Sequence, residues 1–133
     1  MDTAARLADR IAVAEVLLRY GSSLDECDWD RLETCFAADA VGQLAGGPRL
    51  EGYTAIAEAV RAALAHYSIT QHHIANAEVD LDGDRARLRA NLIATHVHDG
   101  GDFVVKGVYR EELHRTADGW RISFHQLDLV WMG

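Results

Sequence analysis

The chain of 133 residues has the length of one domain, and its 49% hydrophobic and 26% charged residues are ordinary for a globular protein. We therefore expect a single domain over residues 1–133. A net charge of -8 opposes binding to a phosphate backbone, and the apolar runs are too short to cross a bilayer, so neither nucleic acid nor a membrane is an expected partner. The first residues lack the basic start and apolar centre of a signal peptide, which predicts a cytoplasmic location.

The first half of the chain has the spacing of helices. Apolar residues recur every three or four positions and predict a first helix from about Thr3 to Tyr20, with a stripe of Leu7, Ile11, Ala14 and Leu18 that is widened by Val13, Leu17, Tyr20 and Leu24. Asp28 is placed to cap a short second helix, and an extended segment over residues 40–45 follows it. Thr54 is expected to cap a third helix.

The second half changes to a period of two, which predicts strands. Four strands from Ile69 onward are separated by turns at Asp82-Gly83, Asp99-Gly100-Gly101 and Asp118-Gly119. Helices followed by a meandering antiparallel sheet make an α+β domain. The alternation of strand and helix that houses nucleotide-binding glycine motifs is missing, so no nucleotide cofactor is expected.

Two histidines lie on strands whose alternation is regular. On the strand from Ala86 to His98, alternation places His96 among small apolar side chains on the face that the helices should cover. On the last strand it places Trp120 and Ile122 on one face and His125 on the other, toward solvent or a dimer partner. His96 is thus a candidate for a pocket and His125 is not.

A neighbouring pair of histidines is ambiguous. On the strand from Ile69 to Leu81, strict alternation brings His73 inward together with Ala77. A bulge between His73 and Ala77 would select His72 instead. The residues alone leave both histidines open.

Several stretches, taken in order, resemble one protein family. They are Asp25-Glu26-Cys27-Asp28-Trp29-Asp30-Arg31-Leu32 after Tyr20, then Thr70-Gln71-His72, then His96, and an ending that runs from Asp118-Gly119-Trp120 to Trp131. In order and spacing they are similar to the SnoaL-like branch of the nuclear transport factor 2-like superfamily, especially its scytalone dehydratase-like proteins, over nearly the whole chain. The resemblance implies a cone-shaped fold, in which a curved antiparallel sheet with a mixed edge wraps around three helices and forms an apolar pocket.

The resemblance also implies a catalytic site without a metal or an organic cofactor. Asp25 matches an acid that pairs with a histidine matching His72, and His96 matches a second histidine of the dehydratases. Asp25 would fix the tautomer of His72, which would act as the base. His96 would donate a hydrogen bond or a proton, and Tyr20 or Tyr109 could polarise a carbonyl. The plainer alternative is that Asp25 only caps or salt-links the end of a helix.

The implied substrate is a small, mostly apolar molecule of aromatic or polyketide type. Tyr53, at the start of the third helix, could close over such a ligand or lie on the surface, and His73 could contact it. No tyrosine lies near Leu44, where the scytalone dehydratase-like enzymes have one, so scytalone itself is not the expected substrate. Dehydration, elimination, isomerisation and polyketide cyclisation all fit the resemblance.

Other readings of the same residues lead to different predictions. His96 and His98, followed by Asp99 and Asp102, have the spacing of a cupin-like metal site, although the helical first third argues against that fold. A non-catalytic small-molecule binding module is another alternative, because a fold does not fix a function. Finally, apolar residues on the outward parity of the sheet, Ile93 and Val97, indicate a homodimer that pairs through the exposed sheet face.

Overall fold

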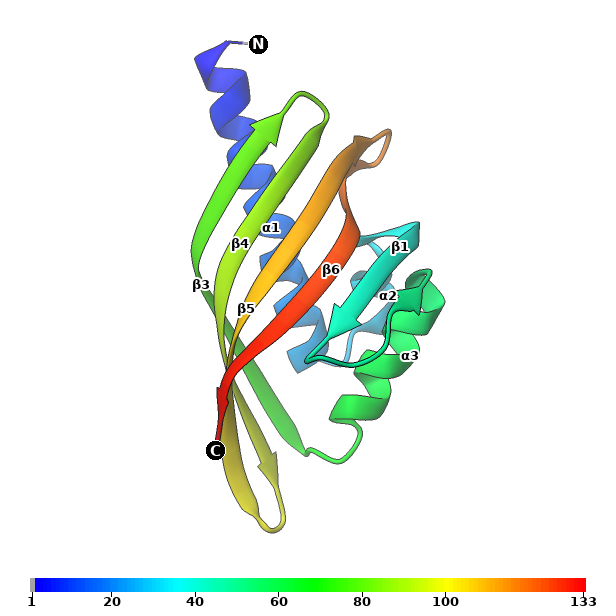
Figure 1. Cartoon of the computed structure of the whole chain (residues 1–133), viewed down its shortest axis with the longest axis vertical. Coiled ribbons are helices and arrows are strands. Elements are labelled where there is room, and N and C mark those ends of the chain that lie inside the picture. The colour runs from blue at the N-terminus through cyan, green and yellow to red at the C-terminus, as the bar shows by residue number, and fades with distance from the viewer. Residues whose placement is uncertain (1) are drawn as a thin grey trace.

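A single sheet with helices against one face makes up the molecule (Figure 1). The computed structural model describes residues 2–133, so Met1 of the expected domain lies outside it. The helices are α1 (Thr3–Asp25), α2 (Trp29–Glu33) and α3 (Tyr53–Leu64), and the strands are β1 (Phe36–Leu44), β2 (Leu50–Glu51), β3 (Ile69–Asp82), β4 (Arg85–His98), β5 (Gly101–Thr116) and β6 (Gly119–Met132). The predicted α+β class is confirmed.

The sheet has the order β2-β1-β6-β5-β4-β3. All neighbouring strands are antiparallel except β1 and β6, which run parallel, so the edge of the sheet is mixed as expected. The four long strands twist and bend strongly in Figure 1, where α1 runs behind them and α3 lies next to β1. None of the helices within residues 2–133 is both long and apolar enough to span a membrane.

Helix α1 buries one half of the stripe that its spacing predicted, the half with Val13, Leu17, Tyr20 and Leu24, and leaves most of the other half exposed. Val13, Val16, Leu17, Tyr20 and Leu24 are buried, whereas Leu7, Ile11 and Leu18 are 58%, 53% and 46% exposed. The start of α1 extends past the β3–β4 hairpin (Figure 1), but Asp9 already contacts Arg115 of β5 and Trp120 of β6. The buried stripe is the one that faces the sheet and continues to Leu24. The helix also runs to Asp25, five residues beyond the predicted end at Tyr20.

The helix caps agree with the sequence in one case and differ in the other. The Asp28 side chain accepts a hydrogen bond from the Arg31 amide at 3.1 Å, as a capping residue should. Thr54, however, does not cap α3, because the helix already begins at Tyr53 with Gly52 as its cap. Gly52 has a φ of +90°, which glycine adopts at little cost, and the chain turns into the helix there without a side-chain cap.

Two irregularities in the sheet decide which histidines face the helices. In β3, Ala75 lies opposite Asn91 and Glu78 opposite Arg89, so one extra residue is inserted near Asn76, whose φ is 55°. This is the bulge that selects His72 rather than His73.

A second bulge reverses the alternation of β6. Ile122 pairs with Leu113 and Phe124 with Glu112, which leaves Ser123 as the extra residue. His125 therefore turns inward and is fully buried. The prediction that His125 faces solvent or a dimer partner was wrong, because a strict period of two cannot include an inserted residue.

Candidate active site

Asp25 and His72 meet across the junction of α1 and β3. The His72 Nδ1 lies 2.6 Å from the Asp25 Oδ1, and the His72 backbone amide donates to the other carboxylate oxygen at 2.9 Å. The Thr70 hydroxyl adds a third hydrogen bond at 3.2 Å. These partners all belong to β3, so Asp25 does more than terminate its own helix: its carboxylate ties the end of α1 to the sheet and orients the His72 ring.

The close approach of α1 to β3 depends on a small residue. Gly21 lies one turn before Asp25, and a Cβ atom built there would be 2.9 Å from the Ile74 Cδ1 and 3.5 Å from the His72 Cβ. Just after the helix, Cys27 has a φ of 54°, which reverses the chain toward α2. The sequence around Asp25 thus brings the acid against the strand and then leads the chain away from it.

His72 lines a cavity of about 340 Å³ between the helices and the sheet. That volume lies in the range of small-molecule sites. Its walls are mostly aliphatic and aromatic, and none of its lining residues is Lys, Arg, Asp or Glu; they are Tyr20, Leu24, Leu44, Ala45, Val60, Ala63, Leu64, Tyr67, His72, Leu92, Ala94, His96, Phe103, Val105, Tyr109, Leu127, Leu129 and Met132. Asp25 is not among them, so it supports His72 from behind rather than contacting the cavity itself.

The second histidine of the cavity is held by aromatic rings. His96 is buried, stacks on Phe103 with ring centroids 4.8 Å apart, and meets the Tyr67 ring edge-on at 4.9 Å. Its ring centroid lies 6.2 Å from that of His72. Burial, and next the neighbouring His72, lower the pKa of His96, which favours a neutral ring that can donate one hydrogen bond. Its Nδ1 has no hydrogen-bond partner among residues 2–133.

Two tyrosines occupy a further part of the cavity wall. Tyr20 and Tyr109 are both buried, and their rings pack edge to face at 5.8 Å. Burial is the main cause that raises the pKa of each phenol well above its usual value. Both therefore remain protonated and can act as hydrogen-bond donors.

The structure brings together five of the residues that the sequence singled out, which are Asp25, His72, His96, Tyr20 and Tyr109. It does not bring Tyr53 or His73 to the same cavity. Tyr53 packs on Phe36 and lines a separate depression, and His73 is exposed.

The His96 and His98 spacing does not form a metal cage. His98 is exposed, and its Nδ1 accepts a hydrogen bond from the Gly100 amide at 3.0 Å. Within residues 2–133, no three His, Cys, Asp or Glu side chains are grouped as metal ligands.

Sequence reasoning missed two aromatic residues of the cavity, Tyr67 and Phe103. Phe103 lies directly opposite His96 in the β4–β5 pairing. Counting outward from the turn at Asp99-Gly100-Gly101 could have found it, because cross-strand partners on one face are neighbours. Tyr67 follows the end of α3, where helical spacing no longer predicts its direction.

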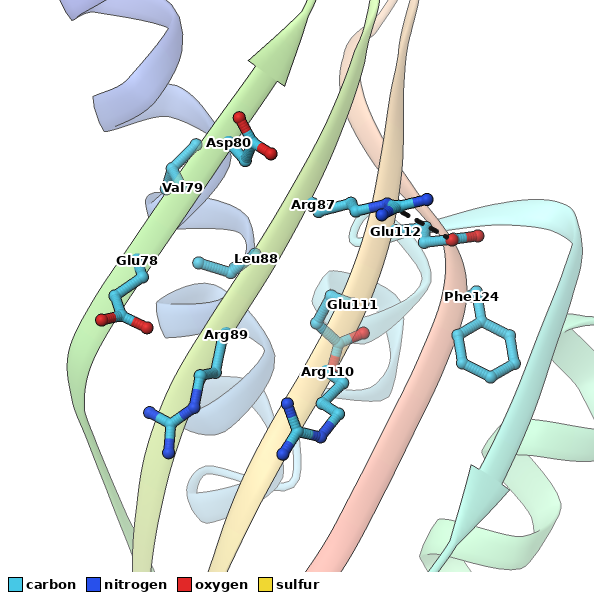
Figure 2. A pocket seen from close by; sticks show the side chains of 10 residues that line it. All are labelled: Glu78, Val79, Asp80, Arg87, Leu88, Arg89, Arg110, Glu111, Glu112 and Phe124. Carbon is cyan, nitrogen blue, oxygen red and sulfur yellow. Dashed lines mark ion pairs between the residues drawn. The ribbon is translucent and has the colours of Figure 1, made fainter.

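Another hollow, of about 460 Å³, lies over β3, β4, β5 and β6 (Figure 2). Figure 2 shows charged side chains from neighbouring strands around it: Glu78 is opposite Arg89, which is opposite Arg110, and Arg87 forms an ion pair with Glu112 at 3.9 Å. Such cross-strand charges stabilise a sheet surface modestly. Glu111 also lines this hollow, but no histidine is among its lining residues, so the apolar cavity lined by His72 and His96 is the candidate site.

Comparison with known proteins agrees with this architecture. A curated relative, the terrestric acid biosynthesis cluster protein E of Penicillium crustosum, is 30% identical over 94% of this chain and 85% of its own length. A solved structure from Novosphingobium aromaticivorans DSM 12444, named after scytalone dehydratase, matches with a TM-score of 0.91 at 19% identity, over 99% of this chain and 91% of that one.

The hexachlorocyclohexane dehydrochlorinase LinA-type3 of Novosphingobium barchaimii LL02 matches with a TM-score of 0.89 at 17% identity, over 99% of this chain and 93% of that one. At such identities the two structures show the fold alone, which is the nuclear transport factor 2-like fold that the sequence predicted. The model of the SnoaL-like domain family matches residues 5–125. The protein therefore belongs to the SnoaL-like domain family.

Proposed function

We propose that the protein is an acid–base enzyme that needs no cofactor and acts on a small, mostly apolar molecule in the cavity. The observation that supports this most directly is the 2.6 Å contact between the Asp25 carboxylate and the His72 Nδ1. This contact leaves Nε2 as the nitrogen of His72 that is available to a ligand. A histidine held in this way is suited to take a proton from carbon.

In the proposed reaction, His72 removes a proton from a carbon atom next to a carbonyl group or a leaving group. The electron pair of that C–H bond forms a double bond, either to the carbonyl carbon or to the carbon that loses the leaving group. Asp25 stabilises the imidazolium that forms. The neutral His96 ring and the hydroxyls of Tyr20 and Tyr109 donate hydrogen bonds to the oxygen on which negative charge develops.

The cavity indicates the chemical class of the substrate. Its lining has no charged side chain, and its volume of about 340 Å³ suits one or two rings rather than a long chain. A neutral ring compound that has a carbonyl, hydroxyl or halogen substituent fits these properties. The relatives support this class, since one is named for a biosynthetic cluster and another for the removal of hydrogen chloride.

The experiment that tests the proposal follows proton removal directly. The protein is incubated in D2O with a panel of cyclic ketones, β-hydroxyketones and chlorinated rings, and NMR measures both products and deuterium at the acidic carbon. Asp25→Asn and His72→Gln should each lower exchange or turnover by about 100- to 10,000-fold, the range of general base catalysis. His73→Gln is the matched control, because His73 is the adjacent residue and is exposed.

The outcomes separate the enzyme from a binding module. Exchange that depends on His72 and not on His73 supports the enzyme. Compounds that bind in the cavity without exchange or turnover, and whose binding is the same in His72→Gln, would replace it with a non-catalytic binding protein.

We also propose that the molecule is a homodimer that pairs through the outer face of the sheet. Ile93 is 46% exposed in the middle of β4, and Lys106 lies beside it on β5. Trp131 on β6 is the next residue in this row and is 53% exposed. Apolar side chains aligned across several strands are a common basis for pairing between copies.

A further inference from the structure

A second acid–histidine pair lies in the core, apart from Asp25 and His72. Glu111 on β5 and His125 on β6 are cross-strand partners, and the His125 Nδ1 lies 2.6 Å from the Glu111 Oε1. Both side chains are completely buried. Nothing in the proposed reaction uses this pair, yet a buried ionisable pair is costly to maintain.

One hydrogen-bonding atom of each side chain in this pair has no partner in the protein among residues 2–133. The Glu111 Oε2 and the His125 Nε2 have no hydrogen-bond partner among residues 2–133. A buried polar atom without a protein partner lowers stability by about 1–3 kcal/mol, so two of them in one core pair need an explanation. A role in positioning or in proton uptake would provide one.

The surroundings of His125 connect the pair to the cavity. The His125 ring lies 4.6 Å from the Tyr20 ring and stacks with the Tyr109 ring at 5.5 Å, measured between centroids. These two tyrosines also line the cavity. The tyrosine rings therefore separate the buried pair from the cavity, and they contact both.

Carboxylates of both acid–histidine pairs also influence the two tyrosines. Glu111 contributes to the raised pKa of both tyrosines, and Asp25 contributes to that of Tyr109. Tyr109 is thus under the influence of a carboxylate from each pair. The other titratable group that acts on this cluster is the Cys35 thiol, which lies close enough to Tyr20 to affect its pKa.

We propose that Glu111 and His125 are positioning residues for the cavity: through the His125 ring they hold the rings of Tyr20 and Tyr109 in place at the cavity wall, and they couple these tyrosines to the uptake of one proton. This inference rests on the proposed acid–base function of the cavity. Neither residue lines the cavity, so both act through the tyrosines.

The test is an NMR titration of the full chain labelled with ¹⁵N-histidine, which needs no substrate. Burial raises the pKa of Glu111 to about 7, so the wild-type ring signals of His125 should change near that pH, and the curve of His72 should show an inflection at the same midpoint. Glu111→Gln should remove this shared inflection from the His72 curve. Tyr109→Phe should weaken the coupling.

The matched control is Glu112→Gln, because Glu112 follows Glu111 but points to the exposed face of the sheet. It should leave the His72 curve unchanged. If the His72 curve is a single step in the wild type, without an inflection shared with His125, the inference is overturned, and this result does not require any variant to fold. A pair that only fills the core would leave His72 insensitive to Glu111→Gln.

This experiment also distinguishes the inference from the proposed function. Coupled titration without any exchange or turnover would support the role of Glu111 and His125 and would contradict the proposed enzymatic function. Turnover that depends on His72, with uncoupled titration, would retain the enzyme and reject the second pair.

Discussion

Gly21 of α1 and Ile74 of β3 are in direct contact, and this contact sets the distance at which the helix crosses the strand that bears His72. A Cβ atom at Gly21 would lie 2.9 Å from the Ile74 Cδ1, which is closer than such atoms approach in proteins. Asp25, one turn later on the same helix, reaches the His72 amide and ring only because the two elements are this close. The Asp25–His72 pair therefore depends on a packing contact that involves neither of its members.

Gly21→Ala should accordingly perturb both stability and the site. The added methyl group must displace the Cδ1 atom of Ile74, which ends a flexible side chain, so the loss in the free energy of unfolding should lie near the lower end of the about 1–3 kcal/mol that overpacking costs. Urea unfolding measures that loss. Ser22→Ala is the control, because Ser22 is exposed in the same turn and its replacement also raises helix propensity, although by less than Gly→Ala does. A Gly21→Ala protein as stable as Ser22→Ala would show that α1 and β3 are not in tight contact.

His96 should make the protein sensitive to acid. Because burial lowers the pKa of His96 from its usual 6.5, the unfolded chain binds more protons than the folded chain between the lowered value and 6.5. The contribution of His96 to stability is therefore present above pH 6.5 and is lost as the pH falls below it. His96→Gln should lose less Tm than the wild type between pH 7 and pH 5, a range that brackets this change. His66→Gln, at an exposed position, should behave as the wild type does.

Much of the fold could be predicted from the sequence because a regular spacing of apolar residues indicates a regular helix or strand. The four long strands and the inward position of His96 follow from alternation that continues without interruption along β4. The turns are marked by Asp-Gly steps, where the chain needs conformations that glycine adopts easily. The pairing of Asp25 with His72, which only the family resemblance favoured at first, requires the β3 bulge, and alternation left that choice open.

The errors arise where a local pattern meets a tertiary constraint. His125 was placed on the wrong face because the extra residue at Ser123 has no signal in composition or spacing. The predicted α1 stripe was twice as wide as the buried one because the helix has two neighbouring apolar rows, and only the position of the sheet decides which row is covered. As a result, the sequence could not reveal the Glu111–His125 pair, since it exists only once the β6 bulge is known.

The proposed homodimer makes a simple prediction about association. Ile93→Glu replaces an exposed apolar side chain of the outer face with a charged one and should convert a dimer to a monomer in sedimentation velocity experiments, because burying a charged side chain in an interface is unfavourable. Ile11→Glu is the control, since Ile11 is similarly exposed, at 53%, but lies on α1. If Ile11→Glu dissociates the dimer and Ile93→Glu does not, the helix face is the interface instead.

The buried Glu111–His125 pair should give stability an unusual dependence on pH. Burial raises the pKa of Glu111 from 4.5 to about 7, so between these values the folded chain binds more protons than the unfolded chain. The resulting stabilisation is complete below pH 4.5 and is lost as the pH rises through about 7, and it amounts to about 3 kcal/mol for this group. Glu111→Gln should therefore flatten the change in unfolding free energy between pH 5 and pH 8, a window that spans most of this transition.

Replacing His125 alone should make the free energy of unfolding depend more strongly on pH. His125→Leu leaves the Glu111 carboxylate buried without its partner, and breaking a buried pair in this way costs about 3–5 kcal/mol when the acid is ionised. At pH 5 the protonated acid has no charge, so the cost should be smaller there than at pH 8. The double variant Glu111→Leu with His125→Leu should recover most of the loss, because two apolar side chains can replace a buried ion pair. Urea unfolding of the two variants at both pH values measures these differences, and an equal cost for His125→Leu at pH 5 and pH 8 would show that Glu111 does not take up a proton in the folded protein.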